Sequence, residues 1–160
     1  MKILLAHNYY RSTAPSGEDA VFRNEKQLLQ NHGFDVITYE KFNDELADST
    51  LLHKLKVARN YVWSWQAYSE LTELLEKERP DVAHFHNTFP QISPSGYDAC
   101  VKYRVPVIQT LHNFRFICPG AMLLRDEKPC ELCLENTLLS AVRYRCYRDS
   151  LTATLPHVLN

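Results

Sequence analysis

The sequence predicts an α/β protein with an open parallel β-sheet and flanking helices. Three short apolar runs each end at the dipeptide His-Asn, at His7-Asn8, His86-Asn87 and His112-Asn113. Short apolar runs separated by room for a helix are typical of buried parallel strands. Ligands of such sheets bind in the crevice at the carboxyl ends of the strands. We therefore expect the three dipeptides to contribute to one site.

Size and composition fit a single globular domain. The chain has 160 residues, of which 45% are hydrophobic, and a formal net charge of −1. This charge gives no reason to expect a nucleic-acid partner. The sequence contains neither a signal-peptide pattern nor the roughly eighteen consecutive apolar residues of a membrane span. We expect a cytoplasmic protein, in which cysteines are free thiols or metal ligands more often than disulfides.

The first third of the chain predicts a strand–helix–strand unit of the parallel-sheet type. A strand over 2–7 is followed by a loop over 12–17, and a second strand covers 35–39. The helix between them begins near Glu18 and ends near Gly33, since glycine commonly stops a helix. The residues expected to face the core from this helix are Val21, Phe22, Leu28 and Leu29.

The middle of the chain predicts two helices within 44–79, then a third strand, a helix over 96–104 and a fourth strand over 105–111. Apolar residues recur at spacings of three and four on one expected helix face: Leu51, Leu55, Ala58, Val62 and Trp65. The segment 51–66 also carries basic residues and tryptophan, as do helices that lie on anionic membranes. Two alternatives follow: peripheral contact at the inner face of the membrane, or a surface helix packed on the sheet.

The pattern changes over 114–148, where cysteines and arginines cluster and strands no longer alternate with helices. We expect a Cys/Arg-rich loop insertion there, followed by a helix beginning near Thr137. No closing strand follows before Asn160. The domain over 1–160 is therefore expected to be incomplete at its C-terminal end.

The Ser16-Gly17-Glu18 turn is the first candidate binding element. Glycine lets a ligand approach the backbone, and the N–H groups at a helix start attract anions. The alternative is an ordinary helix cap, with Ser16 as the N-cap residue and Asp19 three residues later.

His86, Asn87, His112 and Asn113 are candidates because they follow the third and fourth strands. The imidazole of His112 could hydrogen-bond a sugar hydroxyl or a phosphate, or could merely cap its strand. His84 shares a strand face with His86, so the two could bind a metal ion. The sequence shows no third ligand at a spacing typical of a metal site. We expect His84 to be a hydrogen-bonded core residue.

Four cysteines are spaced as a candidate zinc site: Cys118, Cys130, Cys133 and Cys146. Four thiolates can close a tetrahedral structural site, and a long loop with little core would gain from one. Against zinc, the outer two cysteines do not form a second CxxC pair, and free thiols are common. Cys100 is expected in the core.

Taken together and in order, these residues resemble the N-terminal domain of the retaining glycosyltransferases of the GT-B fold, subfamily-4-like, which have two Rossmann-like domains. The likeness covers nearly the whole chain. The segments that carry it are 1–10, 16–18, 79–87 and 106–113, with a cysteine-bearing branch of the family matching 114–119 and 130–133.

The resemblance implies that this half binds a sugar acceptor and that the donor is a nucleotide sugar. It places Gly17 near the donor diphosphate or the acceptor, and His112 as the catalytic contact near the reacting carbon. It implies polysaccharide biosynthesis among other roles, attack assisted by the leaving phosphate, and neither a protein nucleophile nor a catalytic metal. Many relatives have two adjacent glycines where this chain has Ser16-Gly17. The donor-binding second domain is missing from these residues, so we expect them to be inactive alone.

Two other functions stay open at this point. One is a stand-alone binding or regulatory module that partners a separate catalytic chain. The other is a zinc-dependent hydrolase, although four thiolates would close the metal site to substrate.

Overall fold

The computed structural model describes residues 1–14, 16–46 and 50–160, with the side chains of 45–46 and 51–54 left out. The chain divides into two compact units, Met1–Thr110 and Leu111–Asn160. The elements of the first unit are β1 (Lys2–Tyr9), α1 (Gly17–Asn31), β2 (Asp35–Phe42), the 3-10 helix η1 (Asn43–Leu46), α2 (Leu51–Val62), α3 (Trp65–Glu78), β3 (Val82–Phe85), α4 (Ser95–Tyr103) and β4 (Val107–Gln109).

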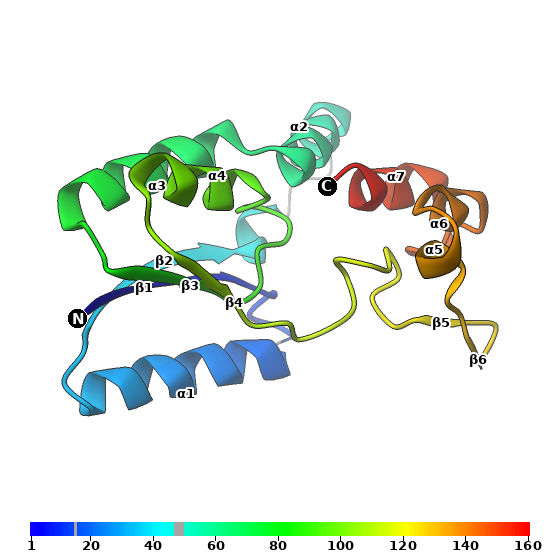
Figure 1. Cartoon of the computed structure of the whole chain (residues 1–160). Coiled ribbons are helices and arrows are strands. Elements are labelled where there is room, and N and C mark those ends of the chain that lie inside the picture. The colour runs from blue at the N-terminus through cyan, green and yellow to red at the C-terminus, as the bar shows by residue number, and fades with distance from the viewer. Residues whose placement is uncertain (15, 47–49) are drawn as a thin grey trace. The chain divides into compact units, whose positions relative to one another are not determined.

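The first unit is a Rossmann-like α/β sandwich, as the sequence predicts. Its four strands are all parallel and lie in the order β2-β1-β3-β4. Helix α1 covers one face of the sheet, and α3 with α4 covers the other (Figure 1). Strand β1 is central, and all of its residues after Lys2 are buried. The carboxyl ends of β1 and β3 therefore lie side by side in the middle of the sheet.

Alternation along the strands builds a core on each face. Leu4, Ala6 and Phe85 pack toward α3 and α4, where Leu71 and Leu75 are buried. On the opposite face, the buried residues Ile3, Leu5, Tyr9 and Phe22 form a smaller cluster with α1. Cys100 is fully buried in the first cluster, as expected, and burial raises the pKa of its thiol to about 12.

Strand limits differ from the expectation at two places. β1 continues to Tyr9, two residues beyond the predicted end at His7, so Asn8 also lies inside the strand. β4 covers only Val107–Gln109, because its partner β3 ends at Phe85, and Ile108 is 53% exposed at this edge of the sheet. The expectation of a long, buried fourth strand was wrong.

Two expected apolar helix faces were also wrong in part. Leu55 and Trp65 are more than half exposed. They lie on different helices, since α2 ends at Val62 and Ser64 caps α3. Among residues 55–62 of α2, Tyr61 is buried, and its ring stacks on Phe89. On α1, Phe22 is buried but Val21 and Leu28 are exposed. The face of α1 that packs on the sheet is therefore narrower than the sequence predicts.

Membrane contact by 51–66 stays a prediction, since the side chains of 51–54, including His53 and Lys54, lie outside the described residues. Lys56, Arg59 and Trp65 are exposed. Within the described residues, no helix has both the length and the apolar character needed to cross a bilayer.

The second unit contains a two-stranded antiparallel hairpin and three short helices. They are β5 (Leu124–Arg125), β6 (Lys128–Pro129), α5 (Leu132–Glu135), α6 (Leu139–Arg143) and α7 (Leu151–Leu159). The helix expected near Thr137 corresponds to α6, which begins two residues later than predicted. The buried hydrophobic residues of the core include only Ala121 and Ala141 from this fully described unit.

Gly96 is the second residue of α4, and we predict that α4 needs a glycine there to pack against the sheet. A Cβ atom there would lie 2.9 Å from Ile92 Cγ2 and 3.0 Å from Phe85 Cε1, inside the core. We expect Gly96→Ala to lower the free energy of unfolding by about 2 kcal/mol through overpacking. Urea unfolding followed by circular dichroism measures this loss.

Gly17→Ala is the matched control, because among the residues that the structure describes, a Cβ at Gly17 has no packing contact within 4 Å. Its free energy of unfolding should change by less than about 0.5 kcal/mol. Equal stability of the two variants would contradict the packing argument.

Candidate functional site

The carboxyl ends of β1 and β3 bring two of the three His-Asn dipeptides together. The His86 amide donates to the Ala6 carbonyl at 3.0 Å, and the Asn8 amide donates to the Asn87 carbonyl at 2.8 Å. The hydrogen-bond ladder therefore continues beyond Phe85, and the two dipeptides are neighbours.

His7 is fully buried and joins three segments of the chain. Its Nδ1 accepts a hydrogen bond from the Asn87 amide at 3.3 Å, so its Nε2 carries the hydrogen and donates to Asp19 Oδ1 at 2.8 Å. The imidazole stacks on Phe22, with the ring centroids 4.8 Å apart. His7 thus fastens β1 to the start of α1 and to the segment after β3.

Asp19 receives donors from several directions. The amides of Ser16 and Tyr10 donate to its carboxylate at 2.9 and 3.4 Å, in addition to the His7 ring. Burial by itself would raise the pKa of Asp19, but these hydrogen bonds outweigh it and hold the pKa below its usual value. A buried carboxylate at this position is therefore ionised.

Ser16 is the N-cap of α1, which agrees with the simpler of the two interpretations of this turn. Its hydroxyl accepts from the Asp19 amide at 3.3 Å, and the Asp19 carboxylate accepts from the Ser16 amide, forming a capping box. Gly17 is exposed, and apart from its chain neighbours and the backbone of α1, no atom of the described residues lies within 4 Å of the place where a Cβ would stand. Glu18 beside it is half-buried. The accessible part of this turn is the backbone at Gly17.

Asn87 braces the loop after β3. Its Nδ2 donates to the Asn8 carbonyl at 2.8 Å, and its Oδ1 accepts from the Phe89 amide at 3.1 Å. Asn8 acts in the same way, donating to Asn43 Oδ1 and accepting from the Gln91 amide, both at 2.9 Å. These buried amides hold the shape of the sheet edge.

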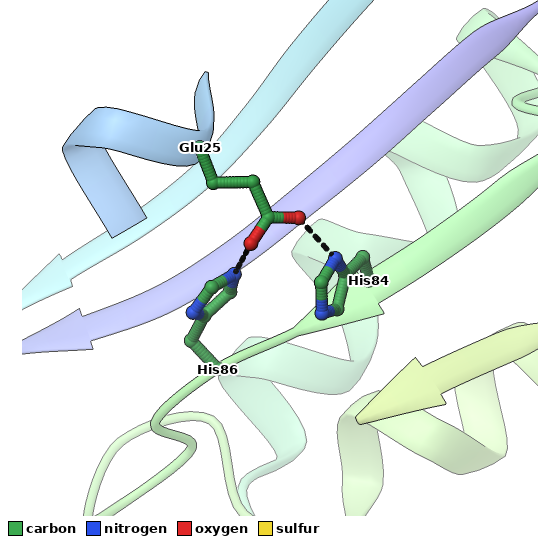
Figure 2. A group of neighbouring side chains, drawn as sticks. All are labelled: Glu25, His84 and His86. Atoms are coloured by element: carbon green, nitrogen blue, oxygen red, sulfur yellow. Dashed lines mark ion pairs between the residues drawn. The ribbon is translucent and has the colours of Figure 1, made fainter. Parts of the chain in front are cut away.

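His84 and His86 point to the same side of β3, as expected, and Glu25 of α1 lies between them (Figure 2). The Glu25 carboxylate oxygens lie 2.7 Å from His84 Nδ1 and 3.2 Å from His86 Nε2. The other His84 nitrogen, Nε2, is 2.7 Å from the Thr110 hydroxyl. His84 is thus the hydrogen-bonded residue that the sequence predicts.

Glu25 supplies the third metal-ligating group that sequence reasoning missed. The candidate ligand atoms of Glu25, His84 and His86 all lie within 4.8 Å of one another. Two imidazoles and a carboxylate are a common zinc ligand set. In this structure the carboxylate oxygens lie within ion-pair distance of both rings, so Glu25 is already the charged partner of His84 and His86. Glu25 lies almost sixty residues before His84, so no sequence spacing could have revealed it.

His112 and Asn113 belong to the second unit, after the end of β4. Both are half-buried, and Asn113 Oδ1 accepts from the Arg115 amide at 2.9 Å. That His112 and Asn113 contribute to the same binding site as Gly17, His86 and Asn87 stays a prediction.

The four cysteines of the candidate zinc site also belong to the second unit, and each is half-buried with a free thiol. Burial raises the pKa of the Cys133 thiol, and the charges of Cys118 and Cys130 add to the effect. Burial likewise raises the pKa of Cys146, with contributions from the other three thiols. The thiols of Cys133 and Cys146 therefore each lie within electrostatic reach of Cys118 and Cys130.

Comparison with known proteins identifies the family. The profile of Glycosyltransferase Family 4 matches residues 20–128, which is more than half of the chain. The chain belongs to Glycosyltransferase Family 4. No curated protein and no solved structure gave a match. The Family 4 match and the parallel sheet together show a glycosyltransferase domain of the GT-B type.

The His7–Asp19 pair predicts a pH-dependent contribution to the stability of this Family 4 domain. Asp19→Asn should lower the free energy of unfolding at pH 7 by about 2 kcal/mol. The substitution removes the negative charge and replaces one carboxylate oxygen, which accepts hydrogen bonds, with an NH₂ group, which donates them. The folded state lowers the pKa of Asp19, so the contribution of the ionised carboxylate is present above about pH 4 and is lost as the pH falls further.

Urea unfolding of both proteins between pH 7 and pH 3 measures the difference, which should shrink toward the acid end. Asp126→Asn is the control, since the Asp126 side chain is 85% exposed. A difference between wild type and Asp19→Asn that is constant with pH would contradict the assignment.

Proposed function

We propose that the first unit binds the sugar acceptor of a retaining glycosyltransferase of the subfamily-4 type. The enzyme would move a sugar from a nucleotide-sugar donor to a glycan, lipid or other acceptor, as in polysaccharide biosynthesis. The observation that supports this most directly is the open backbone of Gly17 at the carboxyl edge of the sheet in a Family 4 domain.

The charges at the start of α1 favour an acceptor over a diphosphate at this position. Glu18 and Asp19 both lie in the first turn of α1, and Asp19 already places an anion at the positive end of the helix. A diphosphate would meet two negative charges there. Sugar hydroxyls, in contrast, donate to carboxylates and accept from backbone N–H groups. We assign Ser16, Gly17 and Glu18 to acceptor hydroxyls.

His112 and Asn113 are proposed to face the donor sugar, with His112 near the reacting carbon. Its imidazole would hydrogen-bond the sugar and stabilise charge as the bond to the leaving phosphate breaks. His86 is almost fully buried, and Asn87 is committed to backbone groups, so these two would shape the floor of the acceptor site. The donor nucleotide would be held by a second Rossmann-like domain outside these 160 residues.

Acceptor binding is the first functional prediction. Glu18→Gln should weaken binding of glycans about tenfold, because it removes the charge from a hydrogen-bond acceptor. Gly17→Val should weaken it by at least as much by filling the open space above the backbone. A glycan array probed with the chain identifies a bound oligosaccharide, and titration calorimetry then compares the variants.

Glu73→Gln is the control, since Glu73 is exposed on α3, away from the start of α1. Unchanged affinity of both site variants for a glycan that the wild type binds would contradict the acceptor assignment.

Activity is the second functional prediction. Residues 1–160 alone should transfer no sugar from UDP-glucose, UDP-galactose or GDP-mannose to a bound glycan, as measured by release of the nucleoside diphosphate. Sustained turnover by the purified chain would overturn the proposal that the donor is held by another domain.

A further inference from the structure

The second unit is poor in the apolar core that normally holds a domain together. Several of its larger hydrophobic residues lie at the surface: Phe114 is 51%, Met122 67% and Leu124 53% exposed. The core of a chain of about fifty residues rarely gives enough stability by itself, and such domains use disulfides or metals. No disulfide joins the five cysteines of the chain, all of whose positions the structure describes.

Backbone hydrogen bonds fix the positions of the four cysteines. The Cys118 carbonyl accepts from the Ala121 amide at 2.7 Å in a tight turn. The Cys130 amide donates to the Leu123 carbonyl at 2.8 Å across the β5–β6 hairpin, and the Cys146 amide donates to the Ala141 carbonyl at 3.0 Å after α6. The Ala141 backbone also lies next to the Cys133 thiol. Each thiol is therefore presented by a defined turn or helix end.

Gly120 shows that two of these turns approach closely. A Cβ atom at Gly120 would lie 3.3 Å from the Cys146 carbonyl oxygen, 3.7 Å from the Cys146 Cβ and 3.8 Å from the Cys118 sulfur. The absence of a side chain at Gly120 lets the segments of Cys118 and Cys146 meet, although they are far apart in the sequence.

We propose that Cys118, Cys130, Cys133 and Cys146 bind one structural Zn²⁺ ion, which holds the second unit together. Four thiolates suit tetrahedral zinc, and each thiol releases its proton to solvent on binding. No three of the described sulfur atoms yet lie within 4.8 Å of one another, so binding draws them together to about 3.8 Å. Arg125 lies within electrostatic reach of Cys130 and Cys146 and would offset part of the negative charge of the site.

The zinc would take no direct part in the proposed sugar transfer, because protein ligands close all four of its positions. Its role is to replace an apolar core with metal bonds. Loss of zinc should therefore unfold the second unit and leave the sheet of the first unit intact.

The test measures zinc in the whole chain purified without chelator. Elemental analysis should give about one zinc per chain, and a thiol reagent that displaces the metal should release it. Cys118→Ser and Cys133→Ser should each lose most of the zinc. Cys100→Ala is the matched control, because Cys100 is buried in the first unit, and it should retain the zinc.

A second control separates the two candidate metal-ligating groups. His84→Ala should also retain the zinc, whereas loss of zinc from this variant and not from the cysteine variants would overturn the proposal. Wild-type protein without zinc, with its thiols paired as disulfides, would overturn it as well.

Hydrogen exchange on the wild-type protein covers the case in which a cysteine variant fails to fold. A chelator should remove amide protection from 111–160 and leave β1 and β3 protected. Unchanged protection of 111–160 after zinc removal would overturn the structural role.

Discussion

The contact between His7 and Asp19 organises the first unit. It lies where the central strand, the first helix and the segment after β3 meet, and each partner is almost fully buried. Because Asp19 also closes the capping box of α1, the same carboxylate sets the direction of the helix and the position of Gly17. The shape of the proposed acceptor site thus depends on an ion that is itself shielded from solvent.

The polar residues at the sheet edge divide into two kinds. His7, Asn8 and Asn87 each form a hydrogen bond with the backbone of another segment. His7 and Asn8 also bond to the side chains of Asp19 and Asn43, and together these bonds make the edge rigid. Gly17 and Glu18 remain on the accessible side of the same edge. A rigid floor beneath an open backbone is what recognition of hydroxyl groups needs, since each hydroxyl must meet a group already in place.

The two units achieve stability in different ways. The first buries Leu4, Phe85 and Leu71 between a sheet and two helices. The second has small or polar buried residues such as Ala121, Ala141 and Thr154, and it has four cysteines where the first has one. A metal site there would explain how a unit with so little apolar burial keeps defined turns at its cysteines.

The sequence by itself determined the class of fold and the family. Short apolar runs separated by helix-length segments are enough to specify a parallel sheet, because strand burial and helix periodicity are local patterns. The capping box at Ser16 and the burial of Cys100 could be predicted in the same way. Strand ends could not, since β1 and β4 stop where hydrogen-bonding partners stop, and those partners come from other segments.

The tertiary structure alone decided which residues meet. Glu25 reaches His84 and His86 because α1 packs across β3, a contact that no spacing in the sequence encodes. The structure also showed that His7 belongs to the buried framework. Its imidazole, which the sequence predicts to contribute to a ligand site, is hydrogen-bonded to the Asp19 carboxylate. Sequence patterns report what each segment prefers, and long-range packing chooses the partner that satisfies each polar group.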